Sequence, residues 1–337
     1  MTPWFADDSV TLYHGDALAV ARELPSESAD CIITSPPYFG LRDYGIPGQY
    51  GLEASPAEYV ETMRMLFAEL RRVLADDGTL WLNLGDSYSA NSEGCQRGMP
   101  ARRRNQAASA VVQPRSGLPP KNLIGIPWRV AFALQDDGWI LRNAVVWHKT
   151  NAMPESIKDR LTSRYEHVFV FSKSRHYWFD LDAIRQQYDG DRDLSRRVRN
   201  GNTNKSNSIA RPWGRPDPAV RGKASGIGVM PNGAQHTAQH ENGRNPGDVW
   251  DIPTAPFAEA HFAVMALALA ERCVQAGCRP GGTALDPFSG SGTTGLAAAK
   301  HGRGYVGIDL SEEYLNMSLR TRLEQPSLDF EGVSACP

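Results

Sequence analysis

The sequence has few cysteines and no long apolar run, and each deficit excludes a class of protein. The cysteines form no Cys-x-x-Cys pair, and they are Cys31, Cys95, Cys273, Cys278 and Cys336. An odd, scattered set argues against a disulfide framework and a thiolate zinc site, and it favours a reducing compartment. The longest apolar stretch, Phe262 to Ala270, is far shorter than the roughly 20 residues that a membrane-spanning helix needs.

A secretory signal and a one-sided charge are also missing. No cationic segment followed by an apolar run opens the sequence, so we expect a cytoplasmic protein, associated with the nucleoid of a prokaryote or of a phage-infected cell. The 36 Lys and Arg nearly balance the 38 Asp and Glu, which excludes a histone-like protein. His14, His148 and His261 have no metal-ligand spacing and no cysteine beside them, so no metal site is predicted.

Two segments are nevertheless basic. Residues 89–120 carry five Arg and one acidic residue, and residues 185–246 carry eleven Lys or Arg and five acidic residues. Both are rich in Gly, Pro, Asn and Ser and lack helical or strand periodicity. They are either solvated insertions or loops that contact a polyanion, and two of them in an otherwise acidic chain favour a nucleic acid. The candidate DNA-contacting residues are Arg102, Arg103, Arg104, Arg196, Arg197, Arg199, Lys205 and Arg211.

Strand and helix patterns alternate along the rest of the chain. Strands are expected at 10–13, 31–33, 79–84, 140–147, 167–171, 283–286 and 304–309. Helices are expected from 59 to a closing turn at Asp77-Gly78, from 127 to Asp137-Gly138, and at 257–276, 293–300 and 312–323. This alternation predicts a doubly wound, mainly parallel α/β sheet that binds ligands at the carboxyl ends of its strands.

A glycine-rich loop follows the strand that ends at Asp286. Gly290, Gly292 and Gly295 fit G-x-G-x-x-G, and Asp309 follows about 20 residues later, as in a dinucleotide site. However, Asp286 would repel a pyrophosphate, and too few residues follow Asp309 for a second nucleotide-binding half. S-adenosylmethionine meets both objections, because it is a cationic nucleoside without phosphate. Asp286 would lie beside its positive charge and Asp309 would accept from its ribose hydroxyls.

A second motif, Thr34-Ser35-Pro36-Pro37-Tyr38, ends the strand at 31–33. Its prolines lack amide donors, so the turn presents carbonyl oxygens and a rigid ring, which suits an amino group. The Ser35 hydroxyl and the Pro36 carbonyl could accept the two hydrogens of a nucleobase amine and prepare its lone pair for in-line attack on a sulfonium methyl. Tyr38 would stack on the flipped base. Taken alone, the motif is more often a plain rigid turn.

Together, the Ser-Pro-Pro-Tyr turn and the Asp-Pro-Phe-Ser-Gly-Ser-Gly-Thr-Thr loop resemble the DNA amino-methyltransferases of the permuted beta group. The resemblance covers roughly residues 10–88, 121–182 and 246–320. It implies a seven-stranded Rossmann-like sheet, S-adenosylmethionine as methyl donor and double-stranded DNA as substrate, and it allows a homodimer and a cognate restriction endonuclease. Many adenine enzymes of this family carry Asp or Asn at the position of Ser35, so Ser favours the 4-amino group of cytosine over the 6-amino group of adenine.

The resemblance also assigns residues and segments. Catalysis falls on Ser35, Pro36, Pro37 and Tyr38. Cofactor binding falls on Asp16, Ala17, Thr34, His261, Phe262, Asp286, Phe288, Ser289, Gly290, Ser291, Gly292, Thr293, Thr294 and Asp309. The target-base pocket falls on Phe39, Trp147, His148, Lys149 and Asn151. The catalytic part is expected at 1–184, a target-recognition insertion at 185–246, the cofactor-binding part at 247–325 and a tail at 326–337.

Other activities remain to be weighed. Carbon-5 methylation of cytosine requires a cysteine that follows proline in its family, and none does here. A dinucleotide-dependent oxidoreductase would bind NAD and transfer hydride. A catalytically inert DNA-binding module would use the same basic loops without consuming a cofactor.

Overall fold

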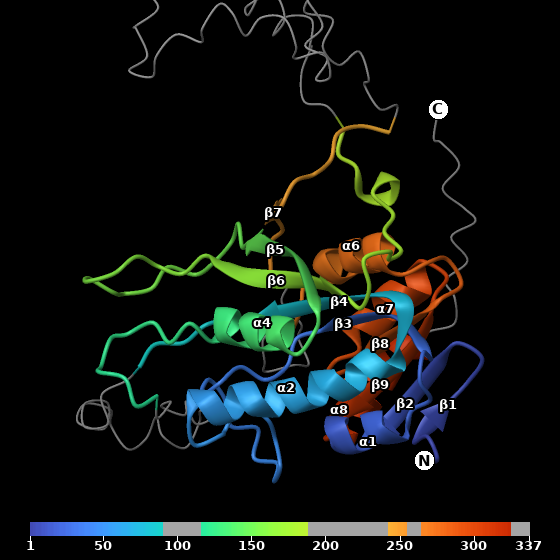
Figure 1. Ribbon diagram of the computed structural model, residues 1–337, viewed down its shortest axis with the longest axis horizontal. Helices are drawn as coiled ribbons and strands as arrows, with labels where there is room; N and C mark the ends of the chain where they lie inside the picture. Colours follow the sequence, from blue (N-terminus) through green and yellow to red (C-terminus); the bar gives the residue numbers. More distant parts are fainter. Residues whose placement is uncertain (90–115, 188–241, 255–263, 325–337) are drawn as a thin grey trace, which may run out of the picture. The chain divides into compact units, whose positions relative to one another are not determined.

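A computed structural model describes residues 1–89, 116–187, 242–254 and 264–324 (Figure 1). The chain divides into two compact units, Met1–Ile184 with Pro246–Pro337, and Arg185–Asn245. The second unit covers nearly the same residues as the insertion expected at 185–246, and its role in target recognition stays a prediction. Ten predicted site residues lie outside the described ranges: Arg102, Arg103, Arg104, Arg196, Arg197, Arg199, Lys205, Arg211, His261 and Phe262.

The described strands form one nine-stranded sheet in the order β1-β2-β9-β8-β3-β4-β6-β5-β7. The strands are β1 (Phe5–Ala6), β2 (Val10–His14), β3 (Ala29–Thr34), β4 (Leu74–Leu84), β5 (Ile140–His148), β6 (Tyr165–Ser172), β7 (Val249–Asp251), β8 (Thr283–Asp286) and β9 (Gly304–Asp309). From β2 to β4 all neighbours are parallel, whereas β6 is antiparallel to both β4 and β5. The predicted doubly wound, mainly parallel sheet is confirmed, and the short strands β1 and β7 extend its two edges.

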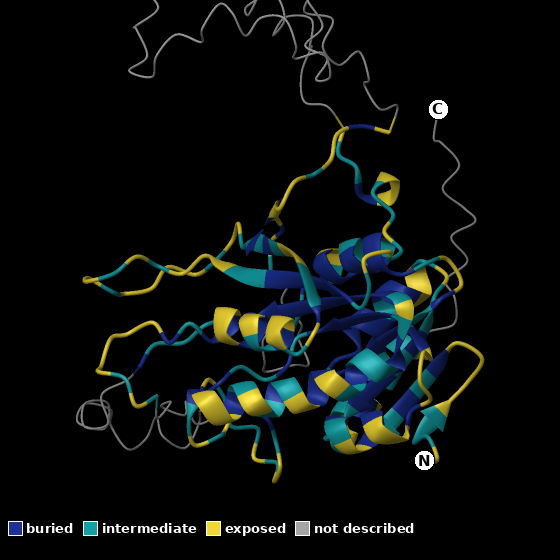
Figure 2. Cartoon of the chain, viewed as in Figure 1, coloured by how far each residue is buried: buried dark blue, intermediate teal, exposed yellow. Residues whose placement is uncertain are grey.

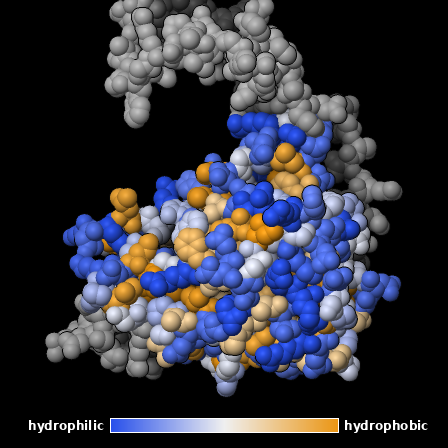
Figure 3. Space-filling view, in the orientation of Figure 1, coloured by the Kyte–Doolittle hydropathy of each residue, from blue (hydrophilic) through white to orange (hydrophobic). Residues whose placement is uncertain are grey.

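Helices cover both faces of the sheet (Figure 1). They are α1 (Ala17–Glu23), α2 (Pro56–Val73), α4 (Ile126–Asp136), α6 (Leu267–Gly277), α7 (Thr293–Lys300) and α8 (Glu312–Ser318). Alternate residues of β3 point to opposite faces: Ile32 packs with α1, α2 and α4, whereas Cys31 and Ile33 pack with α6 and α7. The strands are therefore buried on both sides, as the dark blue sheet between partly yellow helices shows in Figure 2. The outer surface mixes hydrophilic and hydrophobic side chains (Figure 3).

The longest helix, α2, shows how local sequence determines an element. Ser55 caps its first turn by accepting from the Glu58 amide at 3.2 Å, and Pro56 occupies the first position, where no amide donor is needed. Its apolar stripe, from Tyr59 to Val73, is fully buried. The predicted stop at Asp77-Gly78 is wrong: the helix ends at Val73 because Leu74 already pairs with Ala29 of β3. The Asp77-Gly78 pair instead lies where the register of β3 and β4 shifts.

Two helix predictions in the C-terminal part also need correction. The helix expected at 257–276 begins only at Leu267 within the described residues, after a non-helical 264–266, and α6 continues to Gly277. The helix expected at 312–323 is α8, followed by the π-helical turn η3 (Leu319–Leu323). A short 3-10 helix, η1 (Asp182–Ile184), was not expected. Among the described helices there is no candidate for a membrane-spanning segment.

Candidate functional site

The carboxyl ends of the parallel strands border one cavity of about 760 Å³. This volume lies in the range of small-molecule sites. Tyr38, from the turn after β3, and Phe288, from the loop after β8, both line it. The two motifs are far apart in sequence, but β3 and β8 are neighbours in the sheet, which brings their ends together. Both motifs therefore line one cavity at the carboxyl ends of the strands, where the α/β sheet is expected to bind ligands.

Asp286 is the buried centre of the glycine-rich loop. Its carboxylate accepts from Thr34 Oγ1 at 2.7 Å, from Thr294 Oγ1 at 2.7 Å and from the Phe288 amide at 3.0 Å. These donors are neutral, so they only partly offset the loss of hydration. Burial therefore raises the pKa of Asp286 to about 6, and the charge of Asp309 adds to the rise. A buried carboxylate with neutral donors at a cavity wall is suited to a cationic ligand.

Asp309 ends β9 and holds the glycine-rich loop from the other side. Its Oδ2 accepts from the Gly290 amide at 2.7 Å and its Oδ1 from the Ser311 amide at 2.8 Å. Burial raises the pKa of Asp309 as well. Because His14 of β2 pairs with Asp309 in register, Asp16 reaches the same edge of the sheet, where it caps α1 by accepting from the Ala19 amide. Asp16, Asp286 and Asp309 thus all line the cavity at this edge of the sheet.

Aromatic rings form the wall next to these carboxylates. Phe288 packs edge-on against Tyr50, with ring centroids 5.1 Å apart, and Tyr44 packs edge-on against Tyr314 at 6.4 Å. All four residues line the cavity. Of these four, only Phe288 was predicted for the site, because the three tyrosines stand in loop and helix contexts whose place in space the sequence does not determine. Carboxylates beside flat aromatic faces suit a cation that carries a heteroaromatic ring.

The Ser-Pro-Pro-Tyr turn, which also lines the cavity, is held rigidly. Tyr59 Oη donates to the Pro37 carbonyl at 2.9 Å, and the Leu41 amide donates to the Tyr38 carbonyl. Ser35 Oγ donates to Tyr38 Oη at 3.3 Å. The Tyr38 ring lies against Gly85. A Cβ at this position would come within 2.4 Å of Tyr38 Cε2, so a larger residue does not fit here. Backbone, ring and hydroxyl of the turn are therefore all fixed.

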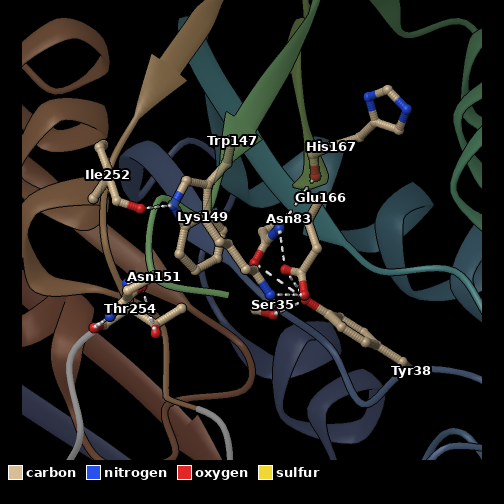
Figure 4. Close-up of polar contacts among 10 residues, drawn as sticks. All are labelled: Ser35, Tyr38, Asn83, Trp147, Lys149, Asn151, Glu166, His167, Ile252 and Thr254. Atoms are coloured by element: carbon tan, nitrogen blue, oxygen red, sulfur yellow. Dashed lines mark hydrogen bonds and ion pairs between the residues drawn. The ribbon is translucent and has the colours of Figure 1, made fainter. Parts of the chain in front are cut away.

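Glu166 is the polar residue that the sequence analysis missed. Its Oε2 accepts from Tyr38 Oη at 2.8 Å and from Asn83 Nδ2 at 3.1 Å, and its Oε1 pairs with Lys149 Nζ (Figure 4). Burial, and then the charge of Glu166, raise the pKa of Tyr38 well above its usual value, so the phenol stays protonated. Because β6 is antiparallel, the start of this strand lies beside the end of β4. Recognising Glu166 from the sequence requires knowing this reversal.

The predicted target-base pocket is only partly assembled around this network. Trp147, Lys149 and Asn151 line the cavity. Trp147 Nε1 donates to the Ile252 carbonyl, and Asn151 exchanges hydrogen bonds with the Thr254 backbone (Figure 4).

Two members of the predicted pocket lie elsewhere. Phe39 is 1 % exposed and packs in the core against Tyr59, because the turn directs its side chain away from the cavity. His148 ends β5, between Trp147 and Lys149, and therefore points to the other side of the strand, where it bonds Asp251. Neither lines the cavity.

The predicted cofactor-binding residues divide in a similar way. Ala17, Ser289, Gly290, Ser291 and Thr293 line the cavity together with the residues described above. Thr34, Gly292 and Thr294 do not line it; the two threonines contact it only through Asp286, and Gly292 caps α7 with a φ of 73°. No group of three or more His, Cys, Asp or Glu among the described residues is placed to hold a metal ion.

Comparisons with known proteins agree with this geometry. Residues 29–320 match the sequence profile of a family described as DNA methylase, of the N6/N4 type. The type II methyltransferase M.Cfr9I of Citrobacter freundii is 41% identical over 314 residues, which are 93% of this chain and 87% of that protein. The DNA adenine methyltransferase YhdJ of Escherichia coli (strain K12) is 26% identical over 94% of this chain and 83% of its own length. Among solved structures, PvuII DNA methyltransferase (cytosine-N4-specific) has a TM-score of 0.60 at 19% identity and covers 94% of this chain and 87% of its own.

Proposed function

The chain belongs to the N6/N4 DNA methylase family, and from this premise we propose that it transfers a methyl group from S-adenosylmethionine to the 4-amino group of cytosine in double-stranded DNA. The observation that carries the proposal is the single cavity shared by the Ser-Pro-Pro-Tyr turn and the glycine-rich loop. A reaction between a cofactor and a flipped base requires both sites to open into one space.

The acidic side of the cavity is assigned to S-adenosylmethionine. When bound, this cofactor supplies an electrophilic methyl group on a sulfonium ion. Asp286 and Asp309 offer carboxylates, and the rings of Phe288 and Tyr50 offer apolar faces. The same carboxylates would repel the pyrophosphate of a dinucleotide. This repulsion and the family membership both disfavour the oxidoreductase alternative.

The opposite side of the cavity is assigned to the target base. Ser35 Oγ and the Pro36 carbonyl accept the two amino hydrogens, which draws the nitrogen lone pair out of conjugation with the ring. Lys149, Trp147 and Asn151 form the wall of this pocket. The ring of Tyr38, fixed at its hydroxyl and against Gly85, provides a flat surface for the base.

Cytosine is proposed over adenine because a serine, and not Asp or Asn, begins the Pro-Pro-Tyr turn. The adenine alternative has the likeness to a DNA adenine methyltransferase in its favour. Residues 89–120 and 185–246 are proposed to bind the DNA backbone and recognise the site. A homodimer and a cognate restriction endonuclease remain proposals.

Three experiments test this function. Plasmid DNA from cells that express the chain is digested to nucleosides and analysed by mass spectrometry; N4-methylcytosine supports the proposal, N6-methyladenine replaces it by the alternative, and unmodified DNA contradicts both. Isothermal titration with S-adenosylmethionine and with NAD then separates methyl transfer from the oxidoreductase reading. A tritiated-methyl transfer assay on the same DNA separates an active enzyme from an inert DNA-binding module.

A further inference from the structure

We propose that Glu166 is a positioning residue that sets the direction of the hydrogen bonds at Ser35, so that the site accepts an amino group and rejects a carbonyl group on the target base. The inference rests on the proposed function. It starts from a chain of three side chains, Glu166, Tyr38 and Ser35, whose hydroxyl and carboxylate oxygens are linked at 2.8 and 3.3 Å (Figure 4).

The carboxylate end of this chain can only accept hydrogen bonds. An ionised carboxylate has no proton to donate, and Glu166 Oε1 forms an ion pair with the Lys149 ammonium. The side chains of Lys149 and Glu166 are only 22% and 16% exposed, so water screens this pair weakly. Tyr38 Oη must therefore donate its single proton toward Glu166.

Asn83 strengthens the same direction. Its Nδ2 donates both to Glu166 Oε2 and to the His167 carbonyl, at 3.1 and 3.2 Å. This fixes the amide so that Oδ1, an acceptor, faces Tyr38 Oη at 3.2 Å. Both inner neighbours of the phenol are then acceptors, and its proton has no reason to turn toward Ser35.

The consequence reaches the cavity through Ser35. Because the Tyr38 proton points inward, Tyr38 Oη offers a lone pair to Ser35, and Ser35 Oγ donates its own proton there. The lone pairs of Ser35 Oγ are left for a group in the cavity. They can accept from the N–H of an amino group, but a carbonyl oxygen at the same place would meet a second acceptor and bind poorly.

The variant Glu166→Gln removes the acceptor that sets the direction of these hydrogen bonds and nearly keeps the shape of the side chain. Lys149 can only donate, so it would hold Gln Oε1 and turn Nε2, a donor, toward Tyr38. Tyr38 Oη could then accept from Nε2, and its own proton would be shared between Asn83 Oδ1 and Ser35 Oγ. In the molecules where it points to Ser35, the Ser35 proton turns into the cavity. Glu155→Gln is the matched control: it removes the same charge from the segment between β5 and β6, where Glu155 pairs with Arg160 at 2.8 Å, outside the cavity lining.

The test measures binding of DNA duplexes in the presence of S-adenosylhomocysteine. The target position, located by sequencing methylated plasmid, carries either the amino base or its keto counterpart, uracil for cytosine or hypoxanthine for adenine. It faces an abasic site, so that both bases leave the stack with equal ease. We expect the unmodified chain and Glu155→Gln to bind the amino base about ten- to a hundredfold more tightly. Glu166→Gln should lower this ratio about threefold or more, and the Pro36 carbonyl, which still accepts, accounts for the preference that is left.

Tyr38→Phe provides a second route to the same result if Glu166→Gln folds poorly. It keeps the ring against Gly85 but removes the hydroxyl that transmits the direction, so the ratio should fall similarly. A double variant should show the ratio of Tyr38→Phe alone, since Glu166 acts through Tyr38. A folded variant of either kind that keeps the unmodified ratio would overturn the role of Glu166. Absence of methyl transfer by the unmodified chain would instead overturn the proposed function.

Discussion

Ser35 and Tyr38 are adjacent in the site, and substituting either should impair methyl transfer but not cofactor binding. We expect Ser35→Ala to slow methyl transfer by about a hundredfold or more, the loss typical for one preorganised polar group at a reacting centre. Tyr38→Ala should cause a comparable loss, since it removes the surface under the base. Affinity for S-adenosylmethionine should change little in both, because the Ser35 and Tyr38 hydroxyls bond each other, Asn83 and Glu166 and not Asp286 or Asp309. Tritium transfer and isothermal titration measure the two quantities, and an equal loss of cofactor affinity would contradict the assigned roles.

Asp286 makes cofactor binding depend on pH. Burial raises its pKa to about 6, so the folded chain holds this proton more tightly than the unfolded chain does. The cost of burying the charge is therefore present above pH 6 and disappears as the pH falls from about 6 toward 4. A cationic ligand needs the carboxylate, and its affinity has the opposite dependence: it should fall below pH 6, by up to about tenfold per pH unit for one proton.

Titration calorimetry with S-adenosylmethionine between pH 8 and pH 5 measures this dependence. Asp286→Asn should bind more weakly at pH 8 and lose most of the slope, whereas Asp309, whose pKa burial also raises, accounts for any remainder. A dissociation constant that stays the same from pH 8 to pH 5 would remove Asp286 from the cationic side of the site.

The residues that the sequence located well are those whose chemistry is local. Ser35 to Tyr38 and Asp286 to Ser291 are continuous motifs at strand ends, and a strand end in a parallel sheet has a known place. Glu166 and Tyr50 were missed because their position depends on a reversed strand and on a loop. Phe39 was misplaced because the motif gives its position in the sequence but not the side of the turn to which its ring points.

At the scale of single elements, the end of β4 controls the catalytic turn. Gly85 follows this strand directly, and an added Cβ would lie 2.4 Å from Tyr38 Cε2 and 2.8 Å from Cδ2. Gly85→Ala should therefore displace the ring, break its bond to Glu166 and reduce methyl transfer at least tenfold. The control is Gly304→Ala at the start of β9, where the nearest atom to an added Cβ is 3.5 Å away.

Three measurements decide the outcome for Gly85. Thermal unfolding checks that both glycine variants fold, calorimetry checks that they bind S-adenosylmethionine, and tritium transfer measures the rate. Full activity of a folded Gly85→Ala variant would show that the Tyr38 ring can move without consequence.

Element boundaries show what periodicity can and cannot predict. Strands β8 and β9 and helix α7 have the predicted bounds: both strands end at an Asp, and Gly302 follows the cap of the helix. The stop of α2 was misplaced because Asp77-Gly78 is a strong turn signal, yet pairing of Leu74 with Ala29 begins β4 before it. Sheet pairing joins residues far apart in sequence, and a local pattern does not contain it.

The molecule as a whole separates its charges. The net charge is −2, and four carboxylates line the cavity, so attraction of DNA must come from other parts of the chain. Residues 89–120 and 185–246 carry sixteen of the 36 Lys and Arg. Phosphate contacts release counterions, and each contributes about 0.9 to the slope of log affinity against log salt concentration.

A triple variant in which Ala replaces Arg102, Arg103 and Arg104 should therefore lower this slope by about 2 to 3 if all three neutralise phosphates. Binding should weaken at low salt on specific and unspecific DNA alike, because phosphate contacts carry no sequence information. A variant that replaces Arg22 and Arg175, both exposed and outside the cavity lining, removes positive charge elsewhere and should leave the slope nearly unchanged. Fluorescence anisotropy at salt concentrations from about 50 to about 300 mM measures the slopes of both variants. The triple variant could leave the slope unaltered although the unmodified chain methylates DNA. The segment 89–120 would then be a solvated insertion, and the contacts to the DNA backbone would have to come from 185–246.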